Sequence, residues 1–344
     1  MILLGLTLIL VIILLAPFSY KKAEEELELF LLLMGIAAVS LSAQWSVLLL
    51  REALTEPIKI SCAVFFAGLL FKFFQKPIAD NVNKIACRLG IKLFVFMVIV
   101  VLGFLSSIIT AIVAALILVE IVTHLKLAKT HEIFLVVMAC FAVGFGAALT
   151  PLGEPLSVIT IAKLKGFPYQ AGFFFLLSHL GIFIVLGIVL FAFFAAAAIP
   201  DMRGNVYGFT ARKAEGRAAI ALRSVKIYFF IAALVLLGKG LKPLVDAYVI
   251  KIPAYGLYWA NMLSAVVDNA TLAAAEITPG MNLLQIKSAL LGMIVAGGML
   301  IPGNIPNIIC AGKLDIKSSQ WARYGLPLGL IAMTLFFFLL TAIH

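Results

Sequence analysis

The fold is decided by a proline-interrupted stretch near the middle of the chain, which reads GAALTPLGEP over residues 146–155. A related stretch reads GGMLIPGNIP over residues 297–306, and both carry a P-x-x-x-P at the same offset. Upstream of each, LSSIITA over residues 105–111 aligns with LSAVVDN over residues 263–269. Paired Gly- and Pro-interrupted apolar segments in the two halves of a chain point to a transporter's binding site. We therefore predict an internal duplication.

The chain around these stretches is apolar almost from end to end. Of its 344 residues, 64% are hydrophobic and 12% are charged, whereas globular proteins carry about 25% charged residues. The mean hydropathy is +1.18. Because about 20 apolar residues suffice for a helix to cross the hydrocarbon core, we predict an all-α polytopic membrane protein. This composition excludes a water-soluble enzyme.

The apolar segments divide the chain into scaffold helices, two repeats and a linker. We expect N-terminal scaffold helices over 1–92, a first repeat over 93–199, a cytoplasmic linker over 200–224 and a second repeat over 225–344. The expected spans are 2–19 (retained, not a signal peptide), 27–50, 58–74, 93–123, 132–161, 170–199, 225–243, 252–278, 283–312 and 322–343.

Several of these segments are too long or too interrupted to be simple helices. The segment 93–123 is expected to break at Gly103 and Ser106–Ser107, and 252–278 around Ser264 to Asn269. We interpret both as re-entrant hairpins with legs of about 12 residues, which reach the midplane of the bilayer. The segments 132–161 and 283–312 carry Gly and Pro near their middle, and we interpret them as broken transmembrane helices.

The basic residues set the expected orientation. With an external N-terminus and re-entrant hairpins, most of the 26 Lys and Arg fall on the cytoplasmic side, as the positive-inside rule requires. We predict a multi-pass protein of the inner (cytoplasmic) membrane with both termini outside. The hairpins would open to opposite sides, which makes the repeats inverted in topology. Because the positive charges lie in short connectors, the net charge of +10 indicates no nucleic-acid partner, and the bilayer is the expected partner.

Two acidic residues fall at the interruptions, where burying a charge costs at least about 2.5–3.5 kcal/mol. Asp268 lies at the expected tip of the second hairpin, and Glu154 in the interrupted part of 132–161. Their counterparts in the other repeat are the uncharged Thr110 and Ile305, so each repeat contributes one carboxyl group. Asp268 could hold a proton or a cation in turn, or it could only cap a helix. Glu154 could face a cavity or be hydrogen-bonded between the repeats.

Further polar groups at the tips and breaks complete an oxygen-rich set, which suits hard cations. We predict an ion-binding site with sodium held by Asp268 and Glu154, and with oxygens from Asn269, Thr150, Asn304, Ser264, Thr271, Ser106 and Thr110. No Lys or Arg falls in these stretches, which argues against an anion site. No Walker, Ser/His/Asp or HExxH pattern occurs, so neither catalysis nor a cofactor is expected.

The remaining charged residues of the apolar segments receive simpler interpretations. His179 is expected to be a hydrogen-bonded packing histidine rather than a proton relay. Glu276 is expected near the membrane interface, and Lys239, Lys242 and Lys251 are expected to snorkel to the outer face.

These motifs resemble those of the ion transporter superfamily, which includes NhaD-type sodium/proton antiporters, arsenite permeases, and citrate and dicarboxylate/sodium symporters. TPLGEP over 150–155 resembles its T-P-[IL]-G-[DE]-P-like segment, and VDNAT over 267–271 resembles the L-D-N motif of the antiporter and arsenite branches. The combination is most similar to the NhaD-type antiporters and to a prokaryotic family of cation transporters within the superfamily. The Ser-Asn-Thr tips of the dicarboxylate branch are missing, which counts against carboxylate transport.

The resemblance implies a scaffold part and a transport part that moves elevator-fashion against a dimer interface. It matches Asp268 and Asn269 to the antiporter motif and Glu154 to the acidic position of the other segment. The first tip lacks an acid or Asn, so two symmetric sodium sites are not expected.

We therefore expect a secondary transporter that exchanges a monovalent cation, first of all sodium, for protons. The alternatives are a sodium-coupled symporter of a small organic acid, then an exporter of arsenite or another anion, and last a non-transporting membrane scaffold or receptor.

Overall fold

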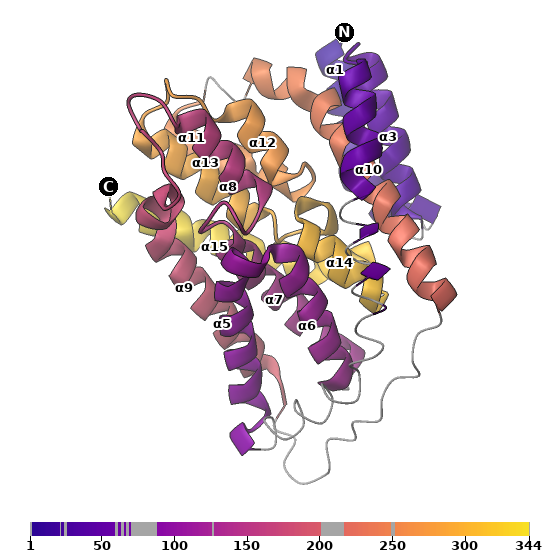
Figure 1. Cartoon of the computed structure of the whole chain (residues 1–344), viewed down its shortest axis with the longest axis vertical. Coiled ribbons are helices and arrows are strands. Elements are labelled where there is room, and N and C mark those ends of the chain that lie inside the picture. The colour runs from indigo at the N-terminus through magenta and orange to yellow at the C-terminus, as the bar shows by residue number, and fades with distance from the viewer. Residues whose placement is uncertain are drawn as a thin grey trace.

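The computed structural model describes residues 2–20, 22–23, 26–58, 61–62, 65–66, 69, 88–125, 127–200, 217–248 and 252–343. Every regular element in these ranges is helical (Figure 1). Within them, five helices are long and apolar enough to cross a membrane: α5 (Ile91–Ile109), α7 (Lys129–Ala147), α9 (Phe175–Ala198), α10 (Arg217–Tyr248) and α15 (Ser318–Ile343). The all-α prediction is confirmed, and these helices fit a polytopic membrane protein.

The N-terminal helices form one layer with α10. Helix α1 (Ile2–Ser19) packs against α3 (Leu27–Leu41), and α3 packs along α10. The single span predicted over 27–50 is wrong, because α3 ends at Leu41 and a second helix begins at residue 47. Ala43 has a positive φ of 53°, which an α-helix cannot accommodate. Most of the predicted span 58–74 lies outside the described residues.

The start of α10 is tied to the start of α3 by an ion-pair cluster. Lys226 Nζ lies 3.1 Å from Glu26 Oε2 and 2.7 Å from Glu28 Oε1. Helix α10 begins at Arg217, so the predicted linker over 200–224 is too long at its end. Its residues 201–216 lie outside the described part of the chain.

The first hairpin consists of α5 and α6 (Ala111–Leu125), separated only by Thr110 with a positive φ of 75°. The break predicted at Gly103 and Ser106–Ser107 is wrong, since α5 continues through all three residues. The Ser106 and Ser107 hydroxyls donate to carbonyl groups three residues earlier, at 2.6 and 2.7 Å. This local bonding satisfies a hydroxyl inside a helix. With 19 residues, α5 is longer than the expected re-entrant leg and could cross a membrane alone.

The second hairpin is shorter and breaks where the sequence predicts. Its first leg comprises α11 (Ala254–Ala260) and the 3-10 helix η1 (Asn261–Ala265), and its second leg is α12 (Asn269–Glu276). Residues 266–268 between the legs are not helical.

The interruptions predicted within 132–161 and 283–312 are also present. Helix α7 is followed by α8 (Pro155–Leu164) after a break over 148–154, and α13 (Leu283–Ala296) by η2 (Ile301–Gly303) and α14 (Ile305–Leu314). Prolines occupy the first turns of α8 and α14, where the missing N–H costs no helical hydrogen bond. The residues before these helices, Glu154 and Asn304, have nearly the same extended backbone, with φ −154° and −155°.

The two halves interlock. The first leg of each hairpin packs on the first part of the following broken helix, α5 on α7 and α11 on α13. The second part of each broken helix packs on the second hairpin leg of the other half: α14 on α6, and α8 on α12. Figure 1 shows α5–α7 toward one end of the molecule and α11–α13 toward the other. Helix α7, with 83% of its span buried, forms the centre, and this packing brings the breaks together.

Candidate functional site

The first tip and the first break are joined by hydrogen bonds. Thr150 Oγ1 donates to the Ser107 carbonyl at 2.5 Å and accepts from Leu152 N at 3.2 Å. The Ala111 N–H donates to the carbonyl of Gly153 at 3.0 Å. Thr150, a predicted ion ligand, therefore holds the break against the tip.

Two other predicted ligands of the first repeat have similar structural contacts. Ser106 Oγ lies 3.0 Å from the Val143 carbonyl of α7, in addition to its bond within α5. Thr110 Oγ1 lies 3.4 Å from Val113 N at the start of α6. The hydroxyls of the first repeat thus mainly connect its segments to one another.

The second break is held by Asn307, whose Nδ2 donates to the carbonyls of Gly297 and Leu300, both at 2.8 Å. Its Oδ1 is buried without a hydrogen-bond partner. Asn304 is buried, and a Cβ added at Gly144 would lie 2.8 Å from its Nδ2. The Asn304 amide therefore rests directly on α7.

Ser264 and Thr271 are the remaining predicted ligands of the second hairpin. Ser264 is fully buried and its Oγ has no hydrogen-bond partner, so it keeps a free oxygen within the protein. The side chain of Thr271 lies outside the described residues.

The predicted acids are brought together from the two halves. Glu154 ends the first break and is only 6% exposed, and neither of its carboxyl oxygens has a hydrogen-bond partner within ordinary geometry. The Asp268 carboxyl group and the Asn269 side chain both act on the Glu154 carboxyl group. Asp268 is half-buried in the non-helical residues before α12. A carboxyl group without donors requires a proton or a cation to be buried.

Asp268 faces a cavity of about 580 Å³. Pro155 and Ile305, which follow Glu154 and Asn304, line the same side of this cavity, together with residues of α12. Residues of α10 and of the helix over 47–58 line the opposite side. The cavity thus separates the N-terminal layer from the part that contains both breaks.

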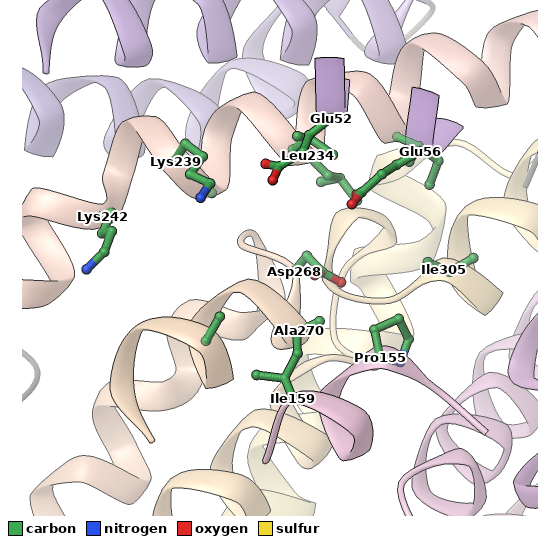
Figure 2. A pocket seen from close by; sticks show the side chains of 14 residues that line it. Glu52, Glu56, Pro155, Ile159, Leu234, Lys239, Lys242, Asp268, Ala270 and Ile305 are labelled. Carbon is green, nitrogen blue, oxygen red and sulfur yellow. The ribbon is translucent and has the colours of Figure 1, made fainter. Parts of the chain in front are cut away.

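Four further charged residues line this cavity, none marked by a motif. Figure 2 shows Glu52, Glu56 and Lys239 projecting toward the side that carries Asp268, with Lys242 farther along α10. Lys239 and Lys242, which we expect to snorkel to the outer face, both line this cavity; Lys251 lies outside the described residues. The i, i+4 spacing of Glu52 and Glu56, which places both on one helical face, is the one sequence signal for them.

Two of the predicted residues do not line this cavity. His179 packs against the Phe175 ring, with centroids 4.5 Å apart, as expected of a packing histidine. Glu276, which we expect near the membrane interface, is 2% exposed and accepts a hydrogen bond from Asn261.

The donor set of the site is built from oxygens. Within the described ranges, no three His, Cys, Asp or Glu side chains gather as a group that could hold a metal ion. The carboxyl groups of Asp268 and Glu154 and the unpartnered oxygens of Ser264 and Asn307 are the polar groups that remain at the tip and the breaks.

Comparison with known proteins gives a family and no named relative. None of the curated proteins compared with the chain matches it. A family model covers nearly the whole chain, over residues 3–343, and the chain belongs to the family that it defines, described as protein of unknown function (DUF1646).

Proposed function

We propose that this protein is a secondary active transporter that exchanges a monovalent cation, first of all sodium, for protons. The observation that carries the proposal is the meeting of Asp268 and Glu154, one carboxyl group from each half, at chain interruptions beside a cavity. An ionisable group at membrane depth is costly unless it serves a transported ion.

The mechanism that we propose is competition for this carboxyl pair. Asp268 faces the cavity and exchanges ions with it, while the buried Glu154 has no hydrogen-bond donor of its own. Two adjacent carboxylates repel each other, so the pair binds a proton or a cation. Binding of one ion displaces the other, and Asn269 supplies a further polar contact to Glu154. This competition couples the two movements without a cofactor.

The packing supports an inverted duplication and a division into two moving parts. The crossed contacts of α6 with α14 and of α12 with α8 are what a two-fold relation between the repeats produces. The cavity has residues of α10 and the 47–58 helix on one side and residues of α8, α12 and α14 on the other, and α10 packs against α12 and α14 beside it. We assign the first set to a scaffold and the second to a transport part. Elevator motion, a homodimer, the inner-membrane location and external termini rest on the resemblance and on charge distribution.

The test is reconstitution in liposomes that contain a pH-sensitive dye. A sodium gradient alone should change the internal pH, with lithium, potassium and calcium compared in turn. Asp268→Asn should abolish the change. Asp315→Asn is the matched control, because Asp315 is exposed at the end of α14 with φ 51°, a conformation that Asn tolerates equally well. Exchange that persists in Asp268→Asn would refute the assignment.

The cavity also favours a second candidate, a sodium-coupled symporter of a small organic acid. Its volume of about 580 Å³ lies in the range of small-molecule sites, and Lys239 and Lys242 would attract a carboxylate. In this case salt alone would leave the internal pH unchanged. Uptake of a labelled dicarboxylate would require sodium and would be lost in the Lys239→Gln, Lys242→Gln double variant.

A further inference from the structure

A buried acid–amide pair joins the two legs of the second hairpin. Glu276 is the last residue of α12, and Asn261 is the first residue of η1 in the other leg. Both are buried, with exposures of 2% and 0%. Asn261 Nδ2 donates to Glu276 Oε2 at 2.9 Å and to the Leu257 carbonyl at 3.0 Å. This pair therefore connects α12 to the α11–η1 leg.

Two oxygen atoms of the pair have no hydrogen-bond donor. The two N–H bonds of the Asn261 amide are already used, so a flipped amide would lose both contacts. Asn261 Oδ1 and Glu276 Oε1 are both buried and neither has a partner. An ionised Glu276 can only accept, which would leave both oxygens unsatisfied. A proton on Oε1 turns this oxygen into the missing donor.

The charged groups around α12 do not replace this proton. Helices α8, α10 and α13 pack against α12. Lys163 of α8 donates to the Ala274 carbonyl, and Lys239 and Lys242 of α10 line the cavity. Lys287 lies on α13 and acts on His179. The Glu276 carboxyl group is affected by its burial and by the hydrogen bond from Asn261.

We propose that Glu276 and Asn261 form a buried proton-binding site, distinct from Asp268 and Glu154, that clamps the two legs of the second hairpin. The protonated Oε1 donates to Asn261 Oδ1 while Asn261 Nδ2 donates to Oε2, a two-point pair. The proton comes from solvent and returns to it when Glu276 ionises. The eight residues of α12 place the clamp about 12 Å from the tip, so it acts apart from the exchanging carboxyl group.

The number of unpartnered oxygen atoms favours a proton over a metal ion at this position. A hard cation takes about six oxygens, whereas the pair offers two unpartnered acceptors. A proton needs only these two.

The clamp has a defined effect on stability. An unfolded Glu releases its proton near about pH 4, whereas the native pair holds it to a higher pH, so between these two values the native state binds more protons than the unfolded chain. Stability therefore falls as the pH rises through this window and levels off once Glu276 has also ionised in the native state. Loss of the proton would also weaken the contact between the legs that hold Asp268 in place.

The test compares Glu276→Gln, Asn261→Ala and the control Glu132→Gln in the purified full-length protein. Glu132 is a second buried acid whose carboxyl group is paired with the Lys129 ammonium at 2.7 Å rather than with an amide, so it serves as the control. Infrared spectra at neutral pH should show the carbonyl stretch of a protonated carboxyl group, and Glu276→Gln alone should remove one component of it.

Thermal unfolding gives the second measurement. Glu276→Gln should keep the Tm at acidic pH and lose its decrease toward alkaline pH, because the Gln amide donates as the protonated acid does. Asn261→Ala should lower the Tm at acidic pH by about 1.5–4 °C, because an unsatisfied buried group costs about 1–3 kcal/mol and a chain of 344 residues shifts by about 1.4 °C per kcal/mol.

Three outcomes would overturn the proposal. The first is an infrared spectrum that Glu276→Gln leaves unchanged. The second is a Glu276→Gln protein that fails to fold or melts as early as Asn261→Ala at acidic pH. The third is a sodium-induced rise in Tm that Glu276→Gln abolishes and Asp268→Asn retains, which would make the pair a cation site. None of these readouts depends on whether the protein exchanges ions.

Discussion

The contact between the second tip and the second break leaves no room for a side chain at Gly303, and Gly303→Ala tests it. A Cβ at position 303 would lie 2.5 Å from the Gly297 carbonyl oxygen, 2.7 Å from that of Ser264 and 3.1 Å from the Cα of Ala265. Gly303 does not have a positive φ, so alanine is conformationally acceptable there. The effect of the substitution is therefore steric.

The size of the effect follows from these distances. Ordinary contact begins at 3.4 Å, so the Ser264 carbonyl must withdraw by about 0.7 Å. Overpacking of this kind costs about 1–3 kcal/mol. With about 2.1 cal/mol/K of unfolding entropy per residue, a chain of 344 residues shifts by about 1.4 °C per kcal/mol, so a middle value of about 2 kcal/mol lowers the Tm by about 3 °C. Because Ser264 belongs to the segment that carries Asp268, the same shift should weaken the apparent affinity for sodium.

Gly312→Ala is the matched control in the adjoining helix. Gly312 lies within α14, is exposed, and an added Cβ would meet nothing within 4 Å. Alanine there should raise the Tm slightly, since Gly costs up to about 1 kcal/mol in a helix. Both variants and the wild type would be melted in the same detergent and assayed for exchange in liposomes.

Equal melting temperatures for Gly303→Ala and the wild type would refute the reasoning, because the tip would then not be wedged on the break. A loss of stability with unchanged sodium affinity would keep the packing argument and contradict the placement of the cation at this tip.

Two further substitutions test the remaining joints of the fold. Thr150→Val removes the bonds to the Ser107 carbonyl and from Leu152 N and should cost about 1–3 kcal/mol in thermal unfolding. Thr150→Ser should restore most of it, and equal melting of the two variants would contradict a hydrogen-bonding role. Gly240→Ala would place a Cβ 2.6 Å from Ala38 Cβ, so α3 should separate from α10 and its amides should exchange hydrogen faster; unchanged exchange in α3 would disprove the close crossing.

The breaks marked by proline were predictable from the sequence. The break predicted at Ser106 and Ser107 was wrong. Pro155 and Pro306 cannot lie inside a helix without losing a backbone bond, so their positions locate the starts of α8 and α14. The hydroxyls of Ser106 and Ser107 donate to carbonyl groups within α5. The sequence pattern of two serines in an apolar segment is the same whether the helix continues or breaks there. Likewise, apolar residues lie on both sides of the interruption near Ala43, so the sequence does not mark it.

The candidate site divides in the same way. Asp268 and Glu154 were predictable because a carboxyl group within an apolar, interrupted segment is costly wherever the chain folds. Thr150, in contrast, is a hydroxyl in the expected place whose contacts are with backbone groups of the protein. A short polar side chain can bind a backbone group or an ion, and the residue type is the same in both cases. Only the atoms around it in the folded protein show which of the two it contacts.

The one-dimensional order of residues determines where the chain must be helical, where it must break and which acids need a reason to be buried. These properties depend on local chemistry: hydropathy, missing N–H groups and the cost of a charge in hydrocarbon. Only the tertiary structure decides that Lys239 and Glu52 face Asp268 across a cavity and that Glu276 meets Asn261 between two legs. Such contacts depend on how helices distant in the chain cross, and side-chain packing between helices sets that geometry.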